Sequence, residues 1–233
     1  MKGNIINARV TFRKSPIHVL ERFSFSNLDE AYSLFKQHAE LHECVILQTC
    51  NRIEIFATGN EDDFIQIKKT WASIAGLEEN AFIDNCEMSV NTDVYDHLLK
   101  LTSGLDSMVI GEEQILGQIK NSITFARNAK TSGEHLNTLF DKAIRVGTRV
   151  RNSTGISKGS ISIGSMAVKL AEENVDEMKL KQILLIGTGE AAALVAKSLN
   201  RRGYGFSISS RTLERSTSFQ KLLEEIQLIL MKY

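Results

Sequence analysis

Residues 45–57 read Val45-Ile46-Leu47-Gln48-Thr49-Cys50-Asn51-Arg52-Ile53-Glu54-Ile55-Phe56-Ala57, and this stretch decides the fold of the first half of the chain. Two short apolar runs flank the polar tetrapeptide 49–52. Short runs rich in β-branched and aromatic side chains are typical of strands. The stretch therefore predicts two strands, near 43–48 and 52–58, that are joined by a tight link containing Cys50.

The segments around this pair complete a β-α-β-β-α-β order. Residues 4–12 alternate like a strand, whereas residues 27–39 and 61–75 carry apolar side chains at helical spacing. Another short strand is expected near 82–89. This order is that of a ferredoxin-like sheet, which places Cys50 between its second and third strands.

After residue 90 the apolar spacing becomes helical. Helices are expected over 91–103, 112–130 and 134–153, and from 162 onward. Gly104 is expected to end the first of these helices, because glycine readily adopts the left-handed backbone of a helix C-terminus. The sequence contains neither an internal repeat nor a low-complexity linker.

The last part of the chain predicts a nucleotide-binding unit. Residues 181–186 form a short apolar run, and Gly187-Thr188-Gly189-Glu190-Ala191-Ala192 follow it before a helical pattern. In such a loop the first glycine permits a tight turn, the second lets the backbone approach a pyrophosphate, and the small Ala192 lets helix and strand pack. The following helix N-terminus favours an anion. These six residues are the predicted cofactor-binding loop.

The next predicted strand, 206–209, ends in Ser210-Arg211-Thr212. An NAD site usually has an acidic residue at this point, which binds the ribose 2′-hydroxyl. An arginine between two hydroxyl side chains suits a 2′-phosphate instead. The sequence therefore predicts NADPH as the cofactor, unless Arg211 only caps an exposed helix.

Composition sets mild bounds on the class of protein. A hydrophobic content of 42% and a charged content of 24% are typical of a soluble globular protein. Because the formal net charge is zero, any nucleic-acid contact must depend on a local basic patch. Three cysteines without a CxxC spacing favour a reducing compartment. With no signal-peptide pattern and no apolar run near the roughly 18 residues of a membrane helix, we expect a cytoplasmic protein with no membrane partner.

Cys50 is the candidate nucleophile. A thiol attacks as the thiolate, which a nearby guanidinium such as that of Arg52 favours. A link between two strands also holds a side chain rigidly while it stays exposed. The alternative is a buried structural cysteine, but the polar neighbours of Cys50 do not suit an apolar pocket.

A second motif occupies residues 97–118, which read His97-Leu98-Leu99-Lys100-Leu101-Thr102-Ser103-Gly104-Leu105-Asp106-Ser107-Met108-Val109-Ile110-Gly111-Glu112-Glu113-Gln114-Ile115-Leu116-Gly117-Gln118. Together with residues 49–52 it resembles the glutamyl-tRNA reductase family, which opens the five-carbon route to haem and other tetrapyrroles. Further matches are Arg149-Val150-Arg151, Gly159-Ser160-Ile161-Ser162 and Ile186-Gly187-Thr188-Gly189-Glu190. The resemblance extends over residues 4–216.

The resemblance implies an α/β protein: a ferredoxin-like catalytic domain with added helices, followed by a partial Rossmann-type domain. We expect a catalytic and glutamate-recognition domain over 1–155, a connecting helix over 156–180 and the partial NADPH-binding domain over 181–233. Family members continue with a C-terminal helical dimerisation domain. We expect this chain to be a truncated form without it, and the apolar residues 226–233 do not resemble the family.

In the family the resemblance implies, the substrate is glutamate esterified to tRNA(Glu). Cys50 would take the glutamyl group as a thioester, and NADPH would reduce it to glutamate-1-semialdehyde. The aminotransferase that uses this aldehyde is an implied partner. Two alternatives remain: a fragment that only binds or deacylates glutamyl-tRNA, and a non-catalytic module that binds tRNA or nucleotide.

The resemblance also assigns roles to residues. His97 would be a general acid or orient the carbonyl, although a lone histidine on a leucine-rich helix is more often structural. Arg52 suits the substrate carboxylate. Glu112 and Glu113 suit its ammonium group, although acidic residues also favour a helix N-terminus. The implied substrate-binding residues are Thr49, Asn51, Arg52, Ser107, Glu112, Glu113, Gln114 and Gln118.

Two further clusters contain residue types that bind metals or phosphates. His38, His42 and Cys44 are too few to predict a metal site, which needs three or four convergent ligands. A basic cluster lies on and just beyond the helix that starts near residue 134. It is either a solvated helix face or a contact for the tRNA phosphate backbone, and its members are Lys142, Arg145, Arg149, Arg151 and Lys158.

Overall fold

The computed structural model describes residues 4–38, 41–112, 114–157, 162–212, 214 and 217–221, without the side chains of His38 and Glu190. The chain divides into two compact units, residues 1–158 and 159–233.

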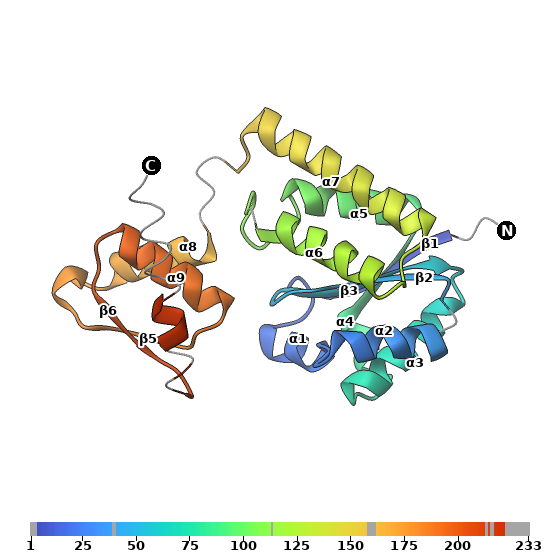
Figure 1. Cartoon of the computed structure of the whole chain (residues 1–233), viewed down its shortest axis with the longest axis horizontal. Coiled ribbons are helices and arrows are strands. Elements are labelled where there is room, and N and C mark those ends of the chain that lie inside the picture. The colour runs from blue at the N-terminus through green and yellow to red at the C-terminus, as the bar shows by residue number, and fades with distance from the viewer. Residues whose placement is uncertain are drawn as a thin grey trace. The chain divides into compact units, whose positions relative to one another are not determined.

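Unit 1 is built on a four-stranded sheet (Figure 1). Its strands are β1 (Asn4–Thr11), β2 (Glu43–Gln48), β3 (Arg52–Gly59) and β4 (Cys86–Val90). Their order is β2-β3-β1-β4, and all neighbouring strands are antiparallel. Because β3 lies between β1 and β2, this is the split β-α-β arrangement of a ferredoxin-like sheet, which confirms the predicted fold.

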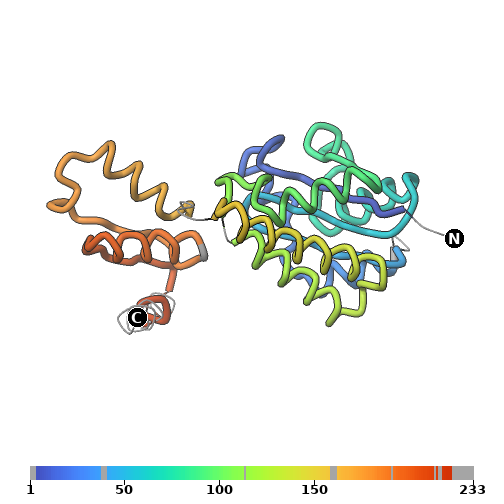
Figure 2. Tube along the Cα trace, turned by 90° about the horizontal axis from the view of Figure 1, so that it is seen from above, coloured from blue at the N-terminus to red at the C-terminus, as the bar shows by residue number. Residues whose placement is uncertain are grey.

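Helices cover both faces of this sheet (Figure 1). On one face lie α1 (Ile17–Phe23), α2 (Leu28–His38), α3 (Asp63–Ala75) and α4 (Ala81–Asn85). On the other lie α5 (Thr92–Ser103), α6 (Gln114–Asn128) and α7 (Glu134–Thr154), which run side by side in Figure 2. The predicted helices after residue 90 are confirmed, except that α6 begins at Gln114 rather than near residue 112.

The strand that was expected near 82–89 is wrong in its first half. Residues 81–85 form the short helix α4, and β4 begins only at Cys86. Phe82 packs edge-on against Phe23 and Trp71, with ring centroids 5.0 and 5.3 Å apart. The Asn85 side-chain amide donates to the Ala81 carbonyl over 2.9 Å. These aromatic contacts with distant residues favour a helical turn. The local sequence pattern does not reveal this turn, because Phe23 and Trp71 are distant in the sequence.

The central strand β3 is buried along its whole length, because helices cover both of its faces. Ile55 and Phe56 are fully buried, as the core of such a sheet requires. Arg52 and Glu54 are buried as well. Burying two charged side chains in a core costs free energy unless they are paired. We therefore expect Arg52 and Glu54 to have charged or hydrogen-bonding partners.

Unit 2 begins with α8 (Ile163–Asn174), whose N-terminal amide of Ser165 donates to the Ser162 hydroxyl over 3.1 Å. A 3₁₀ turn (Met178–Leu180), β5 (Ile183–Ile186), α9 (Glu190–Arg201) and β6 (Phe206–Ser209) follow. The strands β5 and β6 are parallel with Ile183 opposite Phe206. Two parallel strands joined by a helix are the first half of a Rossmann-type fold, as predicted.

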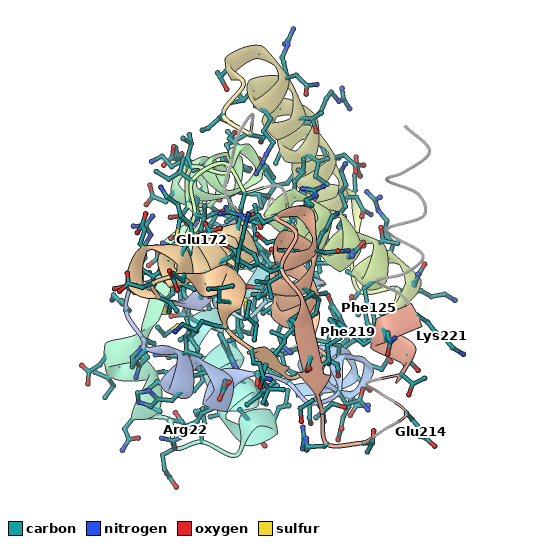
Figure 3. The ribbon with its side chains drawn as sticks, turned by 90° about the vertical axis from the view of Figure 1, so that its left-hand side faces the viewer. Arg22, Phe125, Glu172, Glu214, Phe219 and Lys221 are labelled. Carbon is teal, nitrogen blue, oxygen red and sulfur yellow. The ribbon has the colours of Figure 1, made fainter. Side chains whose placement is uncertain are left out.

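Polar contacts and a small apolar core hold unit 2 together. Glu172 on α8 accepts a hydrogen bond from the Tyr204 hydroxyl over 2.8 Å and pairs with Arg202. Phe219 is buried and belongs to the same core as Ala196. Figure 3 labels Glu172 and Phe219. In the described part of the chain, no helix has both the length and the apolar character that are needed to cross a membrane.

Candidate active site

The link between β2 and β3 is a hydrogen-bonded turn that exposes Cys50. The Thr49 amide donates to the Arg52 carbonyl over 2.9 Å, and the Asn51 amide donates to the Thr49 hydroxyl over 3.1 Å. The Phe12 amide donates to the Asn51 carbonyl over 2.9 Å, which ties the turn to the end of β1. Cys50 is exposed and forms no disulfide. The turn therefore holds the thiol at the surface on a rigid backbone.

The other two cysteines do not offer such a thiol. Cys44 and Cys86 lie in β2 and β4 and are buried. Burial raises the pKa of Cys44 to about 12 and that of Cys86 to about 11. Since the thiolate is the nucleophile, these two side chains are inert at neutral pH.

A buried polar cluster lies directly after the turn. Arg52 Nη1 donates to Glu54 Oε1 over 2.8 Å and contacts Asp106 Oδ2 at 3.3 Å. The Arg52 guanidinium also donates to the Asp106 backbone carbonyl. His97 on α5 places Nε2 2.7 Å from Glu54 Oε2 and Nδ1 3.4 Å from Asp106 Oδ2. Strand β3, helix α5 and the loop after α5 thus meet at these four residues.

The electrostatics of the cluster favour a charged Glu54. Burial by itself raises the pKa of Glu54, but the charges and hydrogen bonds of His97 and Arg52 outweigh burial and hold that pKa well below its usual range. An ionised carboxylate can only accept hydrogen bonds, so His97 Nε2 carries a proton. This fixes the orientation of the imidazole, with Nδ1 toward Asp106. A cavity of about 360 Å³ borders His97, Thr11, Arg13 and Asp106.

Sequence reasoning missed Glu54 and Asp106 as parts of this cluster. Alternate residues of a strand share a face, so Arg52, Glu54 and Phe56 project together toward α5, and Phe56 stacks on the His97 ring at 6.4 Å. The sequence could have indicated Glu54, because it shows two charged residues, Arg52 and Glu54, at alternate positions of a strand that is otherwise apolar. It could not have indicated Asp106, because aspartate is common in surface loops.

The loop between α5 and α6 carries several of the predicted substrate residues. Ser107 is buried, and its hydroxyl has no hydrogen-bond partner among the described residues. Glu112 is buried as well. Glu113 lies outside the described residues, whereas Gln114 and Gln118 are half-buried at the start of α6. The Arg52–Asp106 contact joins this loop to the Cys50 turn.

The predicted nucleotide-binding loop connects β5 to α9. Gly187 has a φ of 108°, which favours glycine, and its amide donates to the Ser209 carbonyl over 2.7 Å. A cavity of about 1110 Å³ borders this loop. Its lining includes residues 186–189, 209–211, Glu214, Ser218 and Phe219. Thr188 and Ala192 are half-buried, whereas Ala191, Arg211 and Thr212 are exposed, and the Ser210 hydroxyl donates to the Thr212 carbonyl over 2.6 Å.

Comparison with known proteins matches two stretches of the chain to two family descriptions. The family described as "Glutamyl-tRNAGlu reductase, N-terminal domain" matches residues 8–154, more than half of the 233 residues. The chain belongs to the glutamyl-tRNA reductase family. The family described as "Shikimate / quinate 5-dehydrogenase" matches residues 169–233, which include the predicted nucleotide-binding loop.

Individual relatives agree with this family. A glutamyl-tRNA reductase of Cenarchaeum symbiosum is 59% identical over 94% of this chain and 52% of its own length. A glutamyl-tRNA reductase of Methanosarcina barkeri is 39% identical over 89% of this chain and 45% of its own length. The solved glutamyl-tRNA reductase from Methanopyrus kandleri has 31% identity and a TM-score of 0.65, over 96% of this chain and 53% of that one. The chain thus spans about half the length of the relatives it matches.

One member of the predicted basic cluster, Arg151, fits neither of the two interpretations, a solvated helix face or a phosphate contact. Arg151 is buried, and its guanidinium donates to backbone carbonyls of Thr102, Gly111 and Glu112. Lys158 lies outside the described residues. The remaining members, Lys142, Arg145 and Arg149, are exposed along α7.

The described residues contain no group of three or more His, Cys, Asp or Glu side chains arranged to hold a metal ion. His42 is exposed and Cys44 is buried, whereas the His38 side chain lies outside the described part of the chain.

Proposed function

We propose that this chain transfers the glutamyl group of glutamyl-tRNA(Glu) to Cys50 and reduces it with NADPH to glutamate-1-semialdehyde, the first step of tetrapyrrole synthesis. The observation that carries this proposal is the exposed Cys50 turn, backed by the His97–Glu54–Arg52–Asp106 cluster. Membership of the glutamyl-tRNA reductase family supports the substrate.

In the first step the Cys50 thiolate attacks the ester carbonyl carbon. The new C–S bond forms as the C–O bond to the terminal ribose breaks, and the ribose oxygen leaves with a proton. His97 is the proposed source of this proton. Glu54 holds the imidazole by its Nε2, and Asp106 Oδ2 lies 3.4 Å from its Nδ1, so Nδ1 would give its proton to the ribose oxygen by exchanging Asp106 for the substrate.

In the second step the thioester is reduced. When bound, NADPH would supply the hydride for the thioester carbonyl carbon, and the C–S bond would break to give the aldehyde and the Cys50 thiolate. The glycine loop and the N-terminus of α9 would hold the cofactor, since an added Cβ at Gly187 or Gly189 would meet no atom within 4 Å. Arg211 borders the same cavity and would pair with the 2′-phosphate.

Ser107, Glu112, Gln114 and Gln118 would recognise the glutamyl group, with Thr49 and Asn51 shaping the turn. The Ser107 hydroxyl, buried and without a partner among the described residues, is ready to bond a ligand. Arg52 would bind the substrate carboxylate only by exchanging the Asp106 carboxylate for it, because Asp106 already lies 3.3 Å from Arg52 Nη1.

The RNA part of the substrate would contact α7. Lys142, Arg145 and Arg149 are exposed at helical spacing on this helix, and within the described residues none of them forms an ion pair. No acidic residue follows Asp141 in α7. Such a row of unpaired cations suits the phosphate backbone. The aminotransferase that consumes the aldehyde is a proposed partner as well.

The test is incubation with glutamyl-tRNA that carries labelled glutamate, followed by intact-protein mass spectrometry of wild type and Cys50→Ser. Wild type should gain one glutamyl adduct without NADPH, and NADPH should discharge it as the aldehyde. Cys50→Ser should gain none. Absence of an adduct on wild type would reject Cys50 as the nucleophile and favour a module that only binds tRNA or nucleotide.

The exposed Cys50 thiol also permits a second candidate function. The chain could take the glutamyl group as a thioester without reducing it, and the thioester would then hydrolyse. In the same experiment this function predicts an adduct that NADPH does not discharge, together with faster release of glutamate from tRNA than in buffer alone.

A further inference from the structure

Arg151, near the C-terminus of α7, directs a buried guanidinium at the loop after α5. Its Nε donates to the Thr102 carbonyl over 2.8 Å, and its Nη1 donates to the Glu112 carbonyl over 2.8 Å. The same Nη1 lies 3.2 Å from the Gly111 carbonyl and 2.9 Å from the Ser157 hydroxyl. One side chain thus contacts the last turn of α5, the end of the loop 104–112 and the segment that follows α7.

The loop is shaped to accept this guanidinium. Gly104 and Gly111 both have a φ of 81°, and the Gly111 amide donates to the Gly104 carbonyl over 2.9 Å, which closes the base of the loop. A Cβ at Gly104 would lie 2.6 Å from Arg151 Nη2, and a Cβ at Gly111 would collide with the Ile156 carbonyl. Larger residues at these two positions would displace the arginine or the segment after α7.

A second buried arginine holds the middle of the same loop. Arg52, two residues after Cys50, contacts the carboxylate and the backbone carbonyl of Asp106. The loop is therefore fixed from β3 on one side and from α7 on the other. Between these two contacts it carries Ser107, and at its end Glu112, the residues proposed above to recognise the glutamyl group.

We propose that Arg151 is a positioning residue for glutamyl recognition: it holds the loop 104–112 in the geometry that the substrate requires and ties it to residues 155–157. This inference rests on the proposed function. Burying a charged guanidinium costs desolvation free energy, and an apolar side chain of similar size would pack equally well without that cost. The planar guanidinium of arginine donates to several carbonyls at once from nitrogens in a fixed geometry. The single ammonium group of lysine cannot donate in this geometry.

The test uses Arg151→Lys and Arg151→Gln in the full chain, with Ile67→Ala as the control. Ile67 is buried in α3, on the other face of the sheet, so its truncation destabilises the fold without touching the loop. Two quantities are measured: half-saturation by glutamyl-tRNA in Cys50 acylation, and inhibition of that acylation by uncharged tRNA. Both Arg151 variants should need about 10- to 100-fold more glutamyl-tRNA, because each hydrogen bond lost between the loop and a charged group of the substrate weakens binding by about tenfold or more. Inhibition by uncharged tRNA should not change.

Hydrogen exchange provides a readout that needs no substrate. In both Arg151 variants the amides of 104–112 and 155–157 should lose protection, whereas those of β1 and β3 should not; Ile67→Ala should not show this local pattern. Unchanged loop protection together with unchanged preference for charged over uncharged tRNA would overturn the inference. A loss of preference that Ile67→Ala reproduces would also overturn it. If wild type itself shows no acylation, the proposed function fails, and the exchange result alone decides whether Arg151 holds the loop.

Discussion

At the residue scale, Glu54 is fully buried, and although burial raises its pKa, contacts with His97 and Arg52 hold that pKa well below its usual range. Arg52 pairs with one of its oxygens and His97 with the other, while the Asn7 amide donates to the latter over 3.3 Å. Each of these contacts disappears or weakens if the carboxylate loses its charge. Glu54 therefore couples the stability of the sheet to the orientation of the proposed catalytic imidazole.

Glu54→Gln should lower the free energy of unfolding by about 3 kcal/mol at pH 7, because it leaves Arg52 buried with one counter-charge fewer. The folded pKa of Glu54 lies below its unfolded value of about 4.3, so the carboxylate stabilises the fold fully above about pH 5. That stabilisation is lost as the pH falls through 4 toward the folded pKa. Urea unfolding of both proteins from pH 7 to 3 measures this, with exposed Glu21→Gln as the control. A stability difference that does not shrink at low pH would contradict the argument.

His97→Asn should slow acylation of Cys50 by about 10²-fold or more if the imidazole donates the proton. Asparagine keeps a hydrogen-bond donor for Glu54 but has no group that titrates near neutral pH. Single-turnover formation of the glutamyl adduct measures the rate, and alkylation of Cys50 by iodoacetamide checks that the thiol is still accessible. An acylation rate equal to that of wild type would remove His97 from the proposed mechanism.

At the element scale, α7 has two faces with different tasks. Its inner face contributes Phe140 and Ala143 to the core and Arg151 to the loop contacts. Its outer face carries the three exposed cations. Basic residues also favour the C-terminal turn of any helix, so the outer face needs a test that separates helix stability from RNA contact.

Replacing Lys142, Arg145 and Arg149 together by glutamine should weaken tRNA binding and reduce its salt dependence. Each lost phosphate contact lowers the slope of log affinity against log salt by about 0.7–0.9, so the slope should fall by about 2–3. Filter binding between roughly 50 and 200 mM salt measures the slope. The matched control removes three exposed cations of α1, α2 and α3, namely Arg22, Lys36 and Lys69. Equal slopes in the two triple variants would show that α7 is only a solvated face.

The preference for NADPH over NADH is predicted from Arg211, which follows β6. Arg211 is exposed beside the nucleotide cavity, which Glu214 also borders. Arg211→Ala should weaken NADPH binding by about tenfold, the effect of one lost charge-assisted hydrogen bond at an exposed site, and leave NADH binding unchanged. Fluorescence titration with both cofactors measures this. Equal affinity of wild type for NADPH and NADH would contradict the assignment of Arg211 to a 2′-phosphate.

At the scale of the whole molecule, the two units differ in how well they are packed. Unit 1 has a four-stranded sheet with helices on both faces and an extended core. The described part of unit 2 has two short strands, and Leu184 and Ile186 are 59% and 78% exposed on one face of them. A two-stranded sheet with an uncovered apolar face is marginally stable.

Unfolding of the chain should therefore occur in two transitions, with unit 2 unfolding at the lower urea concentration. Trp71 is the sole tryptophan of the chain and lies buried in α3, so its fluorescence reports on unit 1 alone. Far-ultraviolet circular dichroism reports on both units. The circular-dichroism curve should begin to fall before the fluorescence curve. Coincident curves would mean that the two units unfold as one.

The sequence by itself determined the four strands of the split sheet with the helices α2 and α3, the helices after residue 90, the strand-loop-helix of unit 2 and Cys50 as the exposed thiol. These follow from apolar spacing and from glycines, which act over a few neighbouring residues. It also pointed to the family through residues 49–52 and 97–118, because both motifs are continuous in the chain.

Only the tertiary structure decided which charges meet. The Glu54–His97 contact joins residues 43 apart, and the Arg151–Gly111 contact joins residues 40 apart. Arg151 looked like part of a basic surface because helical spacing does not say which face is covered, and residues 82–85 looked like a strand because the aromatic contacts of Phe82 are remote in sequence. Local pattern sets each element, whereas burial and pairing of charges depend on where the fold brings distant elements together.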